Sequence, residues 1–212
     1  MKKQQLPWHK AIQLVSRKRP SIRPNDGFLA QLRAYYLMNC SVDCFSKIYR
    51  YFRVFNNVPR YMGSRGPVSM LNYVDDRPGI GQPAASLMYK CRQCRCLLFT
   101  DRSVMQHLQQ TETMPFYAPF EQDPAYLCNE AIYAIPTKWM GPVVKETEGT
   151  IFCPGGCGTR VGSFSWCGWT CGICNTFLSP AFHFDQKKID IIPVARKHTS
   201  LLGQFAGMSV TQ

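Results

Sequence analysis

The clearest chemistry in this sequence lies in three pairs of closely spaced cysteines. Thiolates two or three residues apart fit around one tight turn and supply two corners of a tetrahedral zinc site. Glycines beside the pairs allow the backbone to turn sharply. An odd total of eleven cysteines, without an apolar signal-peptide core, favours metal ligation over a secreted disulfide framework. The pairs are Cys91 with Cys94, Cys153 with Cys157, and Cys171 with Cys174.

The order of these pairs predicts two structural zinc sites. The second and third pairs are about fourteen residues apart, and we expect them to share one ion. The first pair then needs two further ligands, for which His107 and Cys128 are candidates, and Cys96 could replace His107. Four protein ligands leave no open position for substrate, so zinc would be structural. The predicted sites are Cys153/Cys157/Cys171/Cys174 and Cys91/Cys94/His107/Cys128.

Two alternatives for the cysteines remain open at this point. Free cysteines can pack as small hydrophobic side chains, and we interpret Cys40, Cys44 and Cys167 in that way, as structural thiols. Residues 96–103, CLLFTDRS, also have the cysteine–arginine–serine spacing of a cysteine-dependent phosphatase loop. That loop needs glycine and a row of backbone amides around the phosphate, whereas this segment has bulky apolar residues and a strand-like pattern. We therefore expect that residues 96–103 do not form a catalytic loop.

The positive charge is concentrated at the start of the chain. The net charge is +12, and residues 1–60 hold 12 Lys/Arg against 2 Asp/Glu. This asymmetry suggests a polyanionic partner, most simply nucleic acid, although a solvated basic face would look the same. The acid-free first 25 residues also fit a mitochondrial presequence. The candidate RNA contacts are Arg17, Lys18, Arg19, Arg23, Arg50 and Arg53.

The elements that position these residues predict an α+β fold. Apolar residues recur at helical spacing from Trp8 to Val15, from Phe28 to Tyr36 and from Phe45 to Phe52. Short alternating segments in the second half predict β-strands. No apolar run approaches the ~18 residues of a membrane span, so we expect no membrane association. The expected parts are a basic helical segment (1–60), a Gly/Pro-rich linker (61–87), a zinc-binding domain (88–195) and a flexible tail (196–212).

Two stretches of the chain resemble the dual specificity phosphatase twelve family. The first is YKCRQCRCLLF with His107, CNEAIYAIPTKWM and CPGGCGTRVGSFSWCGWTCGICNTFLSPAFHF, which is similar to the family's C-terminal zinc-binding domain. The second is MKKQQLPWHKAIQLVSRKRPSIRPNDGFLAQL, which resembles the last two helices of a dual-specificity phosphatase domain. The resemblance implies helices from the end of a phosphatase domain, followed by a small, mainly β domain with two structural zinc ions.

The resemblance also implies a function in ribosome assembly. The zinc-binding domain would bind precursors of the large ribosomal subunit near the stalk base, contacting rRNA and ribosomal proteins. There it would promote exchange of a placeholder protein for the stalk protein. The expected location is the nucleus, nucleolus and cytoplasm, and no small-molecule substrate is expected.

In the family, the catalytic cysteine loop precedes the segment that resembles MKKQQ, where this chain begins. We therefore expect a protein with no catalytic residues that is not an enzyme. The alternatives are a fragment of an active dual-specificity phosphatase and a generic zinc-ribbon adaptor.

Overall fold

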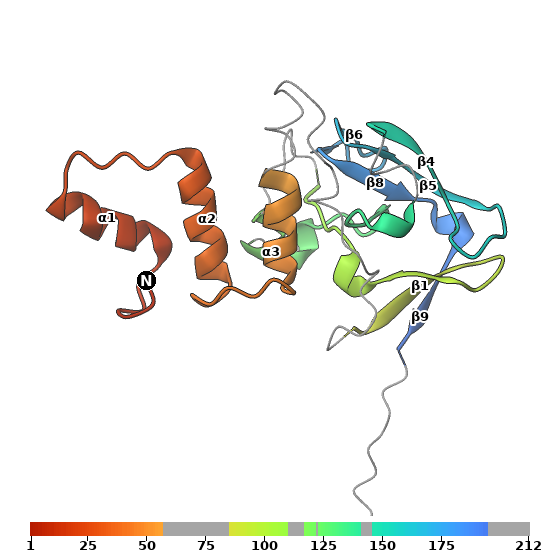
Figure 1. Ribbon diagram of the computed structural model, residues 1–212, viewed down its shortest axis with the longest axis horizontal. Helices are drawn as coiled ribbons and strands as arrows, with labels where there is room; N and C mark the ends of the chain where they lie inside the picture. Colours follow the sequence, from red (N-terminus) through yellow and green to blue (C-terminus); the bar gives the residue numbers. More distant parts are fainter. Residues whose placement is uncertain (57–84, 110–116, 122, 141–145, 195–212) are drawn as a thin grey trace, which may run out of the picture.

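Three helices form the N-terminal part of the computed structural model, which describes residues 1–56, 85–109, 117–121, 123–140 and 146–194 (Figure 1). They are α1 (Trp8–Lys18), α2 (Asp26–Leu37) and α3 (Lys47–Tyr51), which continues into a turn of π-helix at Phe52–Asn56. The side chain of Asn25 caps α2 by accepting a hydrogen bond from Phe28 N, and Ser46 caps α3 in the same way through Tyr49 N. Within the described residues, no helix has the length and apolarity required to cross a bilayer.

The second half consists of short antiparallel strands. One sheet has the order β2-β1-β9 and another the order β3-β8-β5-β4, while β6 and β7 form a small ribbon. The bounds are β1 Leu87–Cys91, β2 Leu97–Thr100, β3 Ile132–Tyr133, β4 Glu148–Phe152, β5 Arg160–Ser165, β6 Trp169–Thr170, β7 Phe177–Leu178, β8 Ala181–Phe184 and β9 Ile189–Pro193. A short helix, α5 (Ala118–Glu121), and single 3-10 turns connect them. The predicted α+β class is confirmed.

Two apolar cores hold these elements together. The first combines side chains from both larger sheets, where the rings of Phe99 and Phe184 meet with centroids 4.7 Å apart. The second joins α2, α3 and the π-helical turn (Ala34, Tyr51 and Val54) to the segments that carry His107, Cys128, Cys171 and Cys174. Packing of the helices is therefore tied to one of the two cysteine clusters.

The helices dock on the β-rich half in order, with α3 the closest and α1 the most distant (Figure 1). Arg50 of α3 is only 3% exposed, and its guanidinium donates to Arg102 O over 2.8 Å and to Ser103 Oγ over 3.2 Å. Arg33 of α2 forms an ion pair with Glu121. α2 and α3 pack within the chain, whereas α1 has no buried residue.

The predicted linker and tail are largely untested, and two details of the predicted helices differ from the structure. Residues 61–84 of the expected linker and all of the expected tail (196–212) lie outside the described residues. The third helix is shorter than its sequence pattern indicates, because Phe45 precedes α3 and is 70% exposed. Phe28, expected on the packed face of α2, is exposed as well, and Gly27 and Ala34 are the buried residues of that helix.

Candidate metal centres

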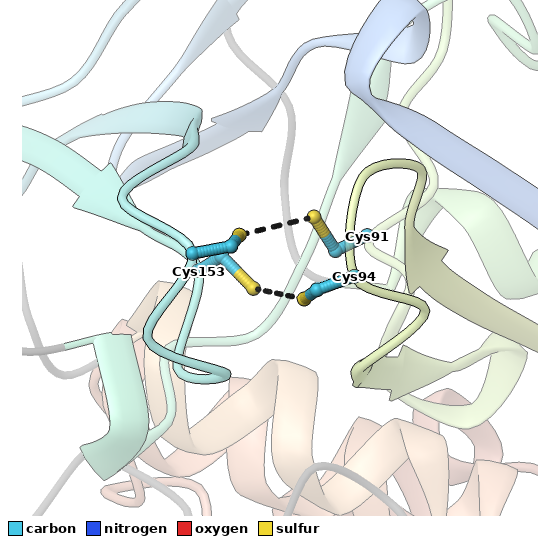
Figure 2. Close-up of side chains that lie close together, drawn as sticks. Cys91, Cys94 and Cys153 are labelled. Carbon is cyan, nitrogen blue, oxygen red and sulfur yellow. Dashed lines mark hydrogen bonds between the residues drawn. The ribbon is translucent and has the colours of Figure 1, made fainter.

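The first cluster brings together four thiols from two hairpin turns. Cys91 ends β1 and Cys94 lies in the turn before β2, while Cys153 and Cys157 lie in the turn between β4 and β5. The Cys94 and Cys153 sulfurs are 3.4 Å apart, and those of Cys91 and Cys157 are 3.8 Å apart (Figure 2). Four sulfurs about 2.3 Å from a zinc ion would be separated by about 3.8 Å at tetrahedral angles. A disulfide would need about 2.05 Å, so the arrangement fits a metal.

The second cluster consists of His107, Cys128, Cys171 and Cys174. Its four ligand atoms lie within 4.8 Å of one another and all four residues are buried. His107 and Cys128 are neighbours because Cys128 N donates a hydrogen bond to His107 O over 2.8 Å. The adjacent residues Leu108 and Leu127 pair in an isolated antiparallel β-bridge. The two remaining thiols come from the turn of the β6–β7 ribbon.

The grouping of ligands corrects the sequence-based prediction. All eight predicted residues belong to the two clusters, but the clusters are Cys91/Cys94/Cys153/Cys157 and His107/Cys128/Cys171/Cys174. The expected pairing of Cys153/Cys157 with Cys171/Cys174 is wrong because strand β5 separates these pairs. A strand of six residues spans about 20 Å, so the two pairs lie beyond opposite ends of it.

Both Cys-x2-Cys turns have the same backbone design. In the first, Cys91 N donates to Cys96 O and Arg95 N donates to Cys91 O, each over 2.9 Å. In the second, Cys171 N donates to Thr176 O over 2.8 Å and Asn175 N donates to Cys171 O over 2.9 Å. Arg95 and Asn175 adopt the left-handed conformation, with φ of 63° and 60°. This repeated geometry directs both thiols of a turn toward one point.

His107 has the environment of a metal ligand. The side chain is fully buried, and neither ring nitrogen has a hydrogen-bond partner among the residues that the structure describes. Burial lowers the pKa of this histidine to about 4, so the imidazole is neutral, as a metal ligand must be. Its ring packs edge-on against Tyr133 with centroids 5.2 Å apart. An ion bound by one nitrogen would satisfy a polar atom that is otherwise costly to bury.

Burial and hydrogen bonding shift the pKa values of the cluster thiols in opposite directions. Burial raises the pKa of Cys153 and of Cys128, the latter to about 11, so these groups keep their protons unless a metal replaces them. A hydrogen bond with Thr159 is the main cause that lowers the pKa of Cys157 to about 6. Both clusters can hold metal ions, and donor sets of four thiols and of three thiols with one imidazole are compatible with zinc.

Cys96 is not part of either cluster, so the alternative in which it replaces His107 is wrong. It lies beside the first cluster, and its sulfur interacts with Leu97 O over 3.7 Å. The segment from Leu97 to Ser103 forms strand β2 and a 3-10 turn, with Leu98 and Phe99 fully buried. Those residues belong to the core and do not surround an anion.

The candidate RNA contacts have different environments. Arg17, Lys18, Arg19 and Arg23 are exposed at the end of α1 and in the following loop. Arg53 is partly buried. Arg50 is a correction, because its guanidinium is buried and bonded to Arg102 and Ser103 of the β-rich half instead of facing solvent.

Comparison with known proteins gives relatives over almost the whole chain. Human dual specificity protein phosphatase 12 is 29% identical over 210 residues, which cover 94% of this chain and 61% of that protein. The Mus musculus protein of the same name is 26% identical and covers 95% and 62%. Tyrosine-protein phosphatase YVH1 of Saccharomyces cerevisiae is 24% identical and covers 87% and 56%. No family model matches the chain.

These names overturn one expectation. The relatives are named as protein phosphatases, so the prediction that this protein is not an enzyme is contradicted. The chain spans about three fifths of the length of the first relatives it matches. Over 94%, 87% and 91% of its length, the chain is similar to human dual specificity protein phosphatase 12 and to the YVH1 phosphatases of Saccharomyces cerevisiae and Schizosaccharomyces pombe.

Proposed function

We propose that the chain acts in assembly of the large ribosomal subunit and that two structural zinc ions hold its binding surface together. It would bind subunit precursors near the stalk base, through rRNA and ribosomal proteins, and promote exchange of a placeholder protein for the stalk protein. This work would place it in the nucleus, the nucleolus and the cytoplasm. The family relationship over nearly the whole chain carries this proposal.

The charge and the cluster geometry support it. Exposed Arg17, Lys18, Arg19 and Arg23 give the helical part a cationic surface suited to phosphate neutralisation. The His107 cluster shares a core with α2 and α3. A zinc ion there would fix the helices against the β-rich half, so RNA contacts from the helices and protein contacts from the sheets would act as one surface.

The test is sedimentation of the tagged protein from cell extract at low and high salt. We expect migration with large-subunit precursors, weakened by salt, and lost in Cys171→Ser and Cys153→Ser. Cys167→Ser is the matched control, because Cys167 is exposed and belongs to neither cluster. Migration of the unchanged protein as a small free species would overturn the ribosomal role.

A second candidate function is removal of phosphate from proteins, which the names of the relatives favour. Turnover of phosphotyrosine and phosphoserine peptides by the zinc-loaded chain tests it directly. Because Cys96 directly precedes strand β2 and belongs to neither cluster, Cys96→Ser should leave any such turnover unchanged. Loss of turnover in that variant would contradict the structural role assigned to this segment.

A further inference from the structure

A hollow of about 490 Å³ lies beside the His107 cluster. This volume is within the ~300–1,000 Å³ typical of ligand pockets. One side is the outer face of the four-stranded sheet, and the other is the β6 strand with the turn that carries Cys171. The lining residues are Ala131, Tyr133, Ser163, Trp169, Thr170, Cys171, Gly172, Ile173 and His183.

The floor of this hollow is a row of residues that pair across the sheet. Tyr133 of β3 is opposite His183 of β8, which is opposite Ser163 of β5, which is opposite Thr150 of β4. Side chains alternate along a strand, and the neighbouring Phe164 belongs to the buried core. The row therefore faces away from that core, with Tyr133 buried and the other three side chains partly exposed, and its small hydroxyl side chains leave space above the sheet.

The walls offer apolar and aromatic surface. The Tyr133 and His183 rings lie 5.3 Å apart between centroids, and half-buried Trp169 stands beside them. Ile173 is at the tip of the metal-binding turn and is 56% exposed. A polar side chain would cost less free energy at this exposed position, since Ile173 contributes to neither core. An apolar rim on an aromatic pocket is typical of a site that receives a partner side chain.

The charges around the hollow decide which partner fits. None of the lining residues is lysine or arginine. Exposed Glu148 lies two positions from Thr150 on β4, so its carboxylate belongs to the same face as the row. Asp185 directly follows β8, two positions from His183, and its carboxylate accepts a hydrogen bond from Lys187 N. Exposed Glu130 adjoins lining residue Ala131. Carboxylates in these places would repel a phosphate backbone and attract lysine or arginine.

We propose that this hollow binds a large apolar or aromatic side chain presented by a lysine- and arginine-rich segment of another protein. The anchor side chain occupies the space above Ser163 and His183, between Trp169 and Ile173. The flanking cations of that segment lie over Glu148, Asp185 and Glu130. This proposal does not depend on the ribosomal role, since it follows from the shape and charge of the β-rich half.

The test uses the zinc-loaded full chain, isotope-labelled for NMR, and a short synthetic peptide with a central phenylalanine between lysines and arginines. We expect binding that shifts the indole signal of Trp169 and the ring signals of His183. A peptide with serine in place of phenylalanine, and one with glutamates in place of the cations, should each bind at least about tenfold more weakly.

Variants of the protein locate the site. Ile173→Lys adds charge at the rim, and Ser163→Trp fills the floor, so each should reduce affinity by at least about tenfold. Phe152→Lys is the matched control, because Phe152 is 53% exposed, close to the value of Ile173, but does not line the hollow. Zinc content of each variant reports whether it has folded.

Three results would overturn the proposal. The first is equal affinity of the peptide for the unchanged protein and for Ile173→Lys and Ser163→Trp. The second is tighter binding of the glutamate peptide than of the cationic one. The third is a short single-stranded oligouridine shifting Trp169 and His183 at lower concentration than the peptide, which would make the hollow a nucleobase site.

Discussion

Cys94 and Cys153 are 59 positions apart in the chain, and their sulfur atoms are 3.4 Å apart. Each cysteine belongs to a different hairpin turn. The cluster that contains them therefore holds the β1–β2 hairpin against the β4–β5 hairpin. The His107 cluster does the same for the segment around Leu108 and the β6–β7 ribbon. A metal in either site would thus close a long loop and reduce the entropy of the unfolded chain.

The grouping of ligands predicts how zinc is lost from double variants. Cys94→Ser with Cys153→Ser damages one cluster, so we expect about one zinc per chain to remain. Cys153→Ser with Cys174→Ser damages both clusters, and we expect none to remain. Metal analysis of the purified variants measures this, with Cys96→Ser as the control that keeps both ions. The reverse pattern for the two double variants would restore the pairing suggested by sequence order.

The sequence indicated the ligands but could not indicate their partners. A Cys-x2-Cys spacing reports a local turn, and the turns at Cys91 and Cys171 formed as their spacing predicted. Which turns meet depends on strand pairing, and β1 pairs with β9 from a distant part of the chain. His107 and Cys128 were expected together and are together, because the Leu108–Leu127 bridge aligns them.

In the helical part too, local sequence patterns did not indicate which residues make long-range contacts. Periodicity predicted the helices but placed Phe28 and Phe45 on packed faces, whereas both are exposed. Arg50 was expected at an RNA surface because it is charged. Its burial depends on Arg102 and Ser103, which are more than fifty residues away in the chain. No local pattern reports such a contact.

Arg50 is predicted to stabilise the contact between the helices and the β-rich half. Arg50→Met removes hydrogen bonds to Arg102 O and Ser103 Oγ and leaves the first acceptor partly buried and the second fully buried. We expect the free energy of unfolding to fall by about 1.5–3 kcal/mol. Urea denaturation followed by tryptophan fluorescence measures it. Arg17→Met is the control, because Arg17 is exposed and such changes cost less than about 0.5 kcal/mol. Equal stabilities of the two variants would show that α3 does not dock as described.

Lys47 is predicted to make the contact between the helices and the β-rich half sensitive to alkaline pH. Burial is the main cause that lowers its pKa from 10.5 to about 8, assisted by Arg102 and Arg50 and opposed by Asp101. Between these values the unfolded chain binds more protons than the folded one, so the free energy of unfolding should rise with pH from about 8 to about 10.5. Lys47→Met cannot titrate and should lack this rise.

The measurement for Lys47 is urea denaturation of both proteins near neutral pH and near pH 10, in the presence of reductant. Other groups titrate equally in the two proteins, so the difference between their pH profiles isolates Lys47. Lys18→Met serves as the control, because Lys18 is exposed. Parallel profiles for the unchanged protein and Lys47→Met would mean that the ammonium of Lys47 is solvated in the folded chain.

Gly155 is predicted to be required for metal binding at the Cys94 cluster. A β-carbon at this position would lie 2.8 Å from Cys96 Cβ and 2.9 Å from Cys94 Sγ, closer than such atoms approach. Gly155→Ala should therefore displace Cys94 and weaken zinc binding at this site by roughly tenfold or more. Gly172→Ala is the matched control in the other cluster, since a β-carbon there meets no atom within 4 Å.

Competition with a chelator, followed by the rate and amount of zinc released, measures the effect of Gly155→Ala. We expect one of the two ions to leave Gly155→Ala at lower chelator concentration, while Gly172→Ala releases both as the unchanged protein does. Since Cys153 accepts a bond from Gly155 N over 3.4 Å, any shift of the turn also removes a donor from that sulfur. Equal release from both alanine variants would show that the two hairpin turns are farther apart than the structure places them.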